Sequence, residues 1–171
     1  MYYWRITKYD PKNRDINGIY LKDEWTDYSD IGKKFEDHIL TEDEYLKTEN
    51  AYITSVLLFM DCLDISLLQL VGLEYIGKNP TFVNIENVII KNNEFYPKET
   101  IVFILRSILR NKFWCILRGM NGLCIKTDWD YYMFIQCPQR CNEAIAKIQA
   151  LGLFVEPVQR IDLFDDEDEN I

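Results

Sequence analysis

The fold class is decided by residues 113–127, which have the sequence FWCILRGMNGLCIKT. Two apolar runs flank Asn121-Gly122, a pair that readily takes the positive φ angles of a type I′ turn. The stretch therefore predicts two antiparallel strands joined by a two-residue turn, with Cys124 opposite Gly119. Neighbouring strands that pair in this way argue against the strict strand–helix alternation of a doubly wound parallel sheet.

The chain after this hairpin predicts a turn, a strand, a helix and a last strand. Residues 128–130 (DWD) have turn chemistry and lead into the apolar run YYMFIQC. A helix is expected over 138–151, because proline is favoured at the first helical position and Gly152 suits the C′ position. The last strand is expected at 153–158, where Pro157 favours the edge of a sheet.

Two further helices are predicted before the hairpin. Thr41 and Glu44 have the spacing of a capping box, in which each side chain binds the backbone N–H of the other residue. The apolar spacing that follows predicts a helix over 42–61. A second amphipathic helix is expected over 97–111, with Pro97 as its first residue.

The remaining apolar runs predict strands, and the whole pattern predicts an α+β fold. An antiparallel or mixed β-sheet with about three packed α-helices is expected, because strands and helices do not alternate regularly. Residues 1–161 are expected to form a single domain that includes a long ordered loop at 19–40, and the acidic residues 162–171 a disordered tail. The strands expected before residue 100 are 2–9, 67–76 and 82–90.

Composition limits the class of partner. The chain has 28 acidic and 19 basic residues and a formal charge of −9, so nucleic acid and anionic membranes are not expected partners, and a basic protein is. The N-terminal sequence has no signal-peptide pattern, and no apolar run is long enough to span a membrane. Five cysteines scattered through apolar runs favour buried free thiols. A cytoplasmic location is therefore expected.

No residue pattern marks a catalytic, cofactor or metal site. His38 is the single histidine, and a solvated loop residue is the expected role for it. Cys137 and Cys141 lack the companion pair of a zinc site, and the glycines form no phosphate-binding loop. Asp61 and Asp64 are the best carboxylate pair, and a polar helix end explains them. No enzyme activity, cofactor or metal is expected.

Charge is distributed unevenly along the chain. Residues 98–126 contain six basic residues and one acidic residue, and we expect them to neutralise acidic loops of the same molecule. Residues 23–30 interleave acids with aromatic rings, which fits either a surface suited to the basic groove of a nuclease or a solvated loop whose rings are buried beneath it. A second acidic and aromatic patch follows at 128–130. The predicted partner-binding residues are Asp23, Glu24, Trp25, Asp27, Tyr28, Asp30, Asp128, Trp129 and Asp130.

In overall type, a small and acidic chain without active-site motifs, the sequence resembles the bacterial immunity proteins of contact-dependent inhibition and other polymorphic toxin systems. The resemblance implies tight 1:1 binding of a toxin domain, expected to be a nuclease, by occlusion of its active site. Two alternatives stay open. One is an enzyme that uses scattered Asp and Glu side chains, and the other is a regulatory or scaffold domain that binds a peptide at a sheet edge, such as 153–158.

Overall fold

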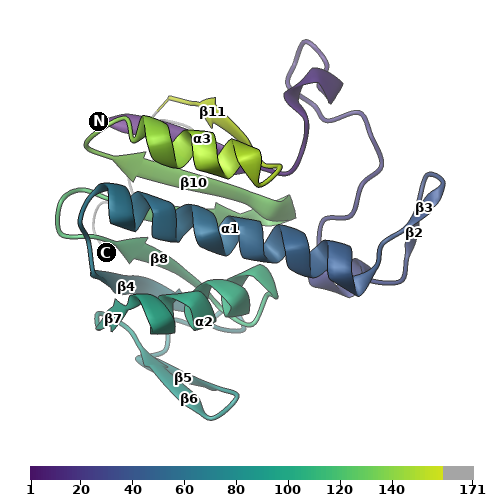
Figure 1. Cartoon of the computed structure of the whole chain (residues 1–171). Coiled ribbons are helices and arrows are strands. Elements are labelled where there is room, and N and C mark those ends of the chain that lie inside the picture. The colour runs from purple at the N-terminus through teal and green to yellow at the C-terminus, as the bar shows by residue number, and fades with distance from the viewer. Residues whose placement is uncertain (160–171) are drawn as a thin grey trace.

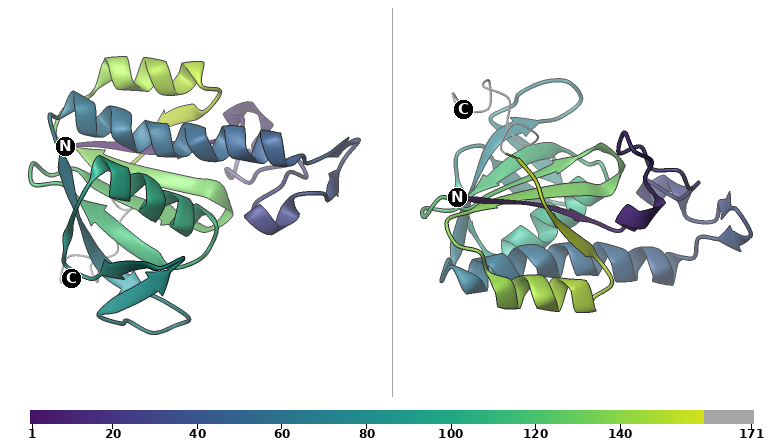
Figure 2. Two further views of the ribbon diagram at one scale, coloured as in Figure 1. Left: turned by 60° about the horizontal axis from the view of Figure 1, so that its bottom comes forward. Right: turned by 90° about the horizontal axis from the view of Figure 1, so that it is seen from above.

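The computed structural model describes residues 1–159, apart from the side chain of Trp129, and shows an α+β fold. One seven-stranded sheet has its three α-helices on one face (Figures 1 and 2). The expected acidic tail, 162–171, lies outside the described residues. No helix within the described part of the chain is long and apolar enough to cross a membrane.

Every neighbouring pair of strands in the large sheet is antiparallel, so the antiparallel form of the predicted fold is confirmed. The strand order is β11-β1-β10-β9-β8-β4-β7, which makes β11 and β7 the edges. The bounds of the strands are Tyr2–Thr7 for β1, Leu67–Glu74 for β4, Phe95–Pro97 for β7, Trp114–Arg118 for β8, Cys124–Asp128 for β9, Tyr132–Cys137 for β10 and Phe154–Pro157 for β11.

The central hairpin, β8–β9, forms as predicted but in a different register. Cys124 pairs with Arg118 and not with Gly119. Gly122 has a positive φ of 82°, whereas Asn121 has none, so the turn is not of type I′. Gly119 continues the hydrogen-bond ladder, since its N–H donates to the Leu123 carbonyl at 2.8 Å. A Cβ at Gly119 would lie 2.9 Å from the Ile65 Cδ1 atom, so the chain passes close to Ile65 there.

The three helices are α1 (Glu42–Cys62), α2 (Lys98–Leu109) and α3 (Asn142–Ala150). The predicted capping box starts α1: the Glu44 N–H donates to Thr41 Oγ1 at 3.3 Å, and the Thr41 N–H donates to Glu44 Oε2 at 3.0 Å. Helix α3 starts later than predicted, because Cys141 has a left-handed backbone (φ 52°) that ends any helix begun at 138. Helix α2 starts one residue later than predicted, since Pro97 is its N-cap.

The predicted strand at 82–90 is instead a small hairpin that projects from the sheet (Figure 1). Its strands are β5 (Phe82–Ile85) and β6 (Val88–Lys91), and the turn residues Glu86 and Asn87 both have positive φ. The loop expected at 19–40 contains the short helix η2 (Tyr28–Asp30) and the two-residue strands β2 (Lys34–Phe35) and β3 (His38–Ile39), after a 3₁₀ turn η1 (Pro11–Asn13).

The core lies between the sheet and the helices. Leu70, Leu117, Ile125 and Ile135 are directly paired across β4, β8, β9 and β10, and all are almost fully buried. Because side chains alternate between the faces of a sheet, these four residues form one apolar row under the helices. All three helices and the large sheet share this single cluster of buried residues.

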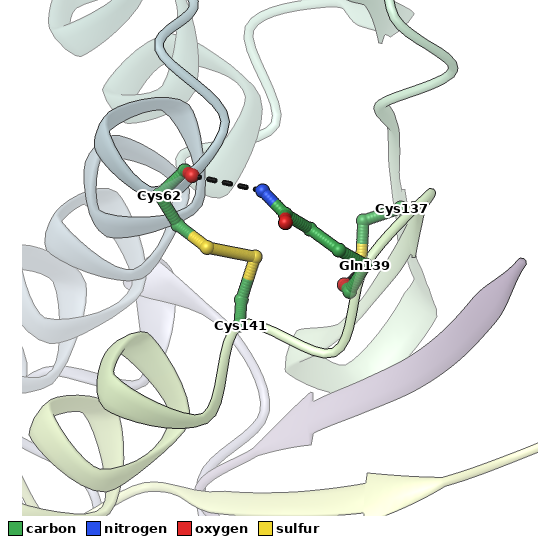
Figure 3. Close-up of a disulfide and its surroundings, with 4 residues drawn as sticks. All are labelled: Cys62, Cys137, Gln139 and Cys141. Carbon is green, nitrogen blue, oxygen red and sulfur yellow. Dashed lines mark hydrogen bonds between the residues drawn. A yellow bond between two sulfur atoms is a disulfide. The ribbon is translucent and has the colours of Figure 1, made fainter.

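The prediction of five free thiols is wrong for two of the cysteines. Cys62 at the end of α1 and Cys141 before α3 form a disulfide, with their Cα atoms 5.9 Å apart (Figure 3). Gln139 supports the same junction, since its Nε2 donates to the Cys62 carbonyl at 3.0 Å. The two cysteines are 79 residues apart, so no local spacing indicated their pairing. Cys115, Cys124 and Cys137 are free and buried, as expected.

We predict that breaking this disulfide destabilises the fold. The bond closes a long loop, and such a bond restricts the unfolded chain, so Cys62→Ser should lower the free energy of unfolding by about 2–4 kcal/mol. Urea denaturation with and without dithiothreitol measures the effect. Reductant should destabilise the unsubstituted protein and leave Cys62→Ser unchanged; equal midpoints in all four samples would contradict the prediction.

Candidate functional site

The structure brings the two predicted partner-binding patches together. Residues 23–30, which include η2, lie beside the short helix η3 (Trp129–Tyr131) at one end of the sheet, and both contribute to a hollow of about 100 Å³. The C-terminal end of α2 supplies an apolar wall. We call this feature the acidic hollow; it is lined by Thr26, Asp27, Ile108, Leu109, Asn111, Trp114, Thr127, Asp128, Asp130, Tyr131 and Tyr132.

Aromatic contacts fix residues 23–30 to the body of the protein. The Trp25 ring is half-buried, with its centroid 5.0 Å from that of Tyr131 and 5.5 Å from that of Tyr45. Tyr28 packs edge-on against Tyr45 at 5.1 Å and remains 38% exposed. Of the two aromatic residues in this segment, Tyr28 therefore has the more exposed ring, whereas Trp25 mainly anchors the segment.

Three of the four acids in the segment, Asp27, Asp30 and Glu24, accept hydrogen bonds within the protein. Asp27 accepts from the Ser29 N–H at 2.6 Å and from the Asn111 side-chain amide. Asp30 accepts from the backbone N–H of Thr26 at 2.9 Å and of Asp27 at 3.1 Å. Burial would raise the pKa of Asp30, but these bonds and the ammonium of Lys33 outweigh it and lower the pKa. These hydrogen bonds fix both carboxylates in position.

Glu24 and the fourth acid, Asp23, differ in exposure. Glu24 is half-buried and accepts from the Lys8 ammonium at 3.1 Å. Asp23 is exposed to solvent. Asp23 is accordingly the acid of this segment that a partner can reach with the least disturbance of the loop.

A buried ion pair lies beneath the segment and was not predicted from the sequence. The Glu49 side chain is 0% exposed and accepts from Arg110 Nε at 2.6 Å and from Arg110 Nη2 at 2.8 Å. Tyr45 donates to Glu49 Oε1 at 3.1 Å, and the Tyr131 hydroxyl donates to Tyr45. The bond to Glu49 raises the pKa of Arg110. The Arg110 guanidinium also lies 4.9 Å from the centroid of the Tyr28 ring, which couples the ion pair to the surface segment.

The second patch is held in an unusual backbone conformation. Asp130 and Tyr131 are consecutive residues with φ of 59° and 61°, which side chains other than glycine seldom adopt. Tyr131 is buried, and its carbonyl accepts from the Tyr52 hydroxyl at 2.5 Å. The buried tyrosine thus fixes a strained turn that places the exposed Asp130 at the hollow. Asp128 is exposed at the end of β9, and the side chain of Trp129 is outside what the structure describes.

Acidic loops were predicted as the partners of the basic stretch at 98–126, but three of its basic residues pair with helix α1 instead. Arg110 and Arg106 both bind Glu49, at 2.6 Å and 3.4 Å, and Lys98 pairs with Asp61. Helix α2 packs beside α1, so the nearest carboxylates belong to that helix.

A second hollow, of about 340 Å³, is lined by Lys8 together with Glu24 and Trp25. The Lys8 ammonium lies 4.0 Å from the centroid of the Tyr9 ring and 4.2 Å from that of Trp25. Burial lowers the pKa of Lys8 to about 8, although the Glu24 carboxylate opposes the shift. A lowered pKa leaves more of the amine neutral, as a nucleophilic lysine requires, while the contacts with the two rings and Glu24 favour its charged form.

Among the other residues considered for catalysis, His38 also lines the hollow at Lys8, whereas Asp61 and Asp64 lie at the C-terminal end of α1. His38 is exposed and its Nε2 lies 2.8 Å from Glu44 Oε2. Asp61 pairs with Lys98, and Asp64 is exposed with a positive φ that turns the chain after α1. Within residues 1–159, no three His, Cys, Asp or Glu side chains are close enough to hold a metal ion.

Exposed apolar side chains gather elsewhere, around the β5–β6 hairpin and the neighbouring sheet edge. This surface was not predicted, because residues 82–90 were interpreted as one strand and not as two. At the opposite edge of the sheet, β11 pairs with β1, in agreement with the edge position predicted from Pro157. The exposed apolar residues near the hairpin are Leu67, Tyr75, Ile76, Phe82, Val88, Ile89 and Phe95.

We predict that Arg110→Met destabilises the protein and loosens the surface segment. It leaves the buried Glu49 carboxylate without its main partner, which should cost about 3 kcal/mol of unfolding free energy. Chemical denaturation measures the loss, and amide exchange should accelerate at Trp25 and Tyr28. Lys112→Met, an exposed neighbouring site, is the matched control and should change stability by less than about 0.5 kcal/mol. Equal effects of the two substitutions would refute a structural role for the ion pair.

Comparison with known proteins leaves the site to be judged on its own geometry. No protein-family model, no curated protein and no solved structure matches this chain.

Proposed function

We propose that this chain is a protein-binding inhibitor, an immunity protein that neutralises a basic bacterial toxin domain, most simply a nuclease, by covering its active site. The observation that carries the proposal is the convergence of residues 23–30 and 128–130 around the acidic hollow. Both patches were selected from the sequence for their mixture of acids and aromatic rings, and they lie far apart in the chain. Their meeting creates one continuous surface with both kinds of group.

The charges of this surface suit a partner that binds nucleic acid. A nuclease groove is lined with basic side chains that bind phosphates, and a fixed set of carboxylates can occupy the same positions. The formal charge of −9 on the whole chain adds long-range attraction that accelerates association. Asp23, Tyr28 and Asp130 are exposed and would make the first contacts.

The surface is also preorganised for binding. Capping bonds fix Asp27 and Asp30, ring contacts fix Trp25, and the strained turn fixes Asp130. A surface that is already ordered loses little conformational entropy when a partner binds, so more of the interaction energy appears as affinity. This rigidity favours an inhibitor that acts by occlusion.

The volume of the acidic hollow does not favour the enzyme alternative at that place, whereas the hollow at Lys8, of about 340 Å³, is of substrate size. Sites for small-molecule substrates usually have volumes of about 300–1,000 Å³, against about 100 Å³ for the acidic hollow. The peptide-binding alternative retains one favourable observation, the position of β11 at the edge of the sheet. A peptide that adds to this edge would protect β11 and leave residues 23–30 unaffected.

We place the protein in the cytoplasm, where a nuclease toxin reaches its substrate. The Cys62–Cys141 disulfide is the observation that weighs against this location, because reducing compartments keep most thiols free. Trapping the thiols of freshly lysed native cells by alkylation would decide the matter. A reduced pair in those cells fits the cytoplasm, and a fully oxidised pair argues for an oxidising compartment.

Affinity capture from the native host, with the tagged protein at moderate salt, tests the proposal directly. We expect one stoichiometric basic partner whose toxic activity, assayed with the purified partner, falls to zero at a 1:1 ratio. A captured partner whose activity is unaffected by saturating protein would contradict the immunity function. Failure to capture any partner that is co-expressed from a neighbouring gene would do the same.

We predict that the binding rate depends on the exposed acids of the surface. Asp23→Lys should reduce the association rate constant for the captured partner about tenfold at low salt, and the difference should shrink as salt is raised. Surface plasmon resonance measures both rates. Glu143→Lys, which makes the same charge change on the exposed side of α3, is the control and should have a much smaller effect. Identical rate constants for the two variants would remove residues 23–30 from the interface.

A further inference from the structure

One buried polar atom at the acidic hollow has no hydrogen-bond partner among the residues that the structure describes. Thr127 lines the hollow from β9, its residue surface is 7% exposed, and its Oγ1 makes no hydrogen bond. Leaving a buried hydroxyl unpaired is unfavourable, and folded proteins seldom do so without a functional reason. The position therefore calls for a ligand that can hydrogen-bond to this oxygen.

The negative charge of the hollow favours a cationic ligand. Among the described residues that line it, the charged ones are Asp27, Asp128 and Asp130. These carboxylates come from two loops and a strand end, and they do not approach closely enough to hold a metal ion. A cation that carries N–H donors on several atoms can bind carboxylates that lie too far apart for one metal ion.

The volume and the apolar wall of the hollow favour an arginine side chain as this ligand. A volume of about 100 Å³ accepts one side-chain head group and excludes larger ligands. Ile108 and Leu109 provide an apolar wall for the aliphatic stem. A guanidinium has five N–H donors in a planar fork, which can serve carboxylates and a hydroxyl oxygen together, whereas an ammonium is a compact point charge.

We infer that the acidic hollow is a receptor for one arginine side chain of the partner protein. The guanidinium donates to carboxylates at the rim and to Thr127 Oγ1 at the wall. This inference rests on the proposed function and specifies how the partner is recognised. An arginine that normally holds a nucleic-acid phosphate would, in the complex, be held by aspartates.

The probe is acetyl-arginine amide, added to the ¹⁵N-labelled full chain and followed by NMR. We expect a dissociation constant of roughly 1 mM, as befits one isolated head group, with shifts at Thr127, Asp130 and Asn111. Acetyl-citrulline amide, which has nearly the same shape without the charge, should cause none of these shifts. Shifts that are equal for both compounds, or that spread evenly over exposed acids, would overturn the inference.

Two substitutions separate recognition from folding. Thr127→Val removes the unpaired hydroxyl at nearly constant volume, so the thermal midpoint should stay the same or rise while probe affinity falls about fivefold. Asp130→Asn keeps a residue that tolerates the left-handed backbone and should weaken binding by a similar factor. Asp37→Asn, an exposed acid in the β2–β3 hairpin, is the control and should leave affinity unchanged. Unchanged affinity in folded Thr127→Val and Asp130→Asn would place the probe elsewhere.

The inference and the proposed function can fail separately. If the captured partner is neutralised but neither variant weakens its binding, the function stands and the arginine receptor is wrong. If the probe binds as expected but no captured protein is neutralised, the receptor stands and the immunity function is wrong.

Discussion

The carboxylate of Glu49 is completely buried in α1, where it is bound by Arg110 from the end of α2 and by the hydroxyl of Tyr45. A charge in that position is tolerated only with a well-placed opposite charge and further hydrogen bonds, so it fixes where α2 ends relative to α1. The same Arg110 lies against the ring of Tyr28, and Tyr45 receives a hydrogen bond from Tyr131. One buried ion pair therefore determines the position of both acidic patches.

This link between core and surface explains why the site was only partly predictable. Residues 23–30 and 128–130 were identified from their composition, because acids beside aromatic rings are visible in a linear sequence. Their convergence was not, since it depends on the packing of α1, α2 and the sheet. Glu49 could have been noticed: it lies four residues after Tyr45 on the apolar side of a predicted helix, where a charged residue is out of place.

The fold was predictable where the signals were local. The capping box at Thr41 marked the start of α1 correctly, because both of its hydrogen bonds are made within one turn. The central hairpin was found but with the wrong register, because its turn is not the expected type I′ turn and has a positive φ at Gly122 but not at Asn121. The disulfide was missed because Cys62 and Cys141 meet only when α1 and α3 pack together.

The central claim is that one preorganised acidic surface, at the meeting point of residues 23–30 and 128–130, binds a basic protein. Hydrogen–deuterium exchange of the full chain, with and without the captured partner, tests this most directly. We expect slowed exchange at both segments together, and little change at β11 or in the β5–β6 hairpin. Protection confined to β11 or to that hairpin, with both acidic segments unaffected, would contradict the account.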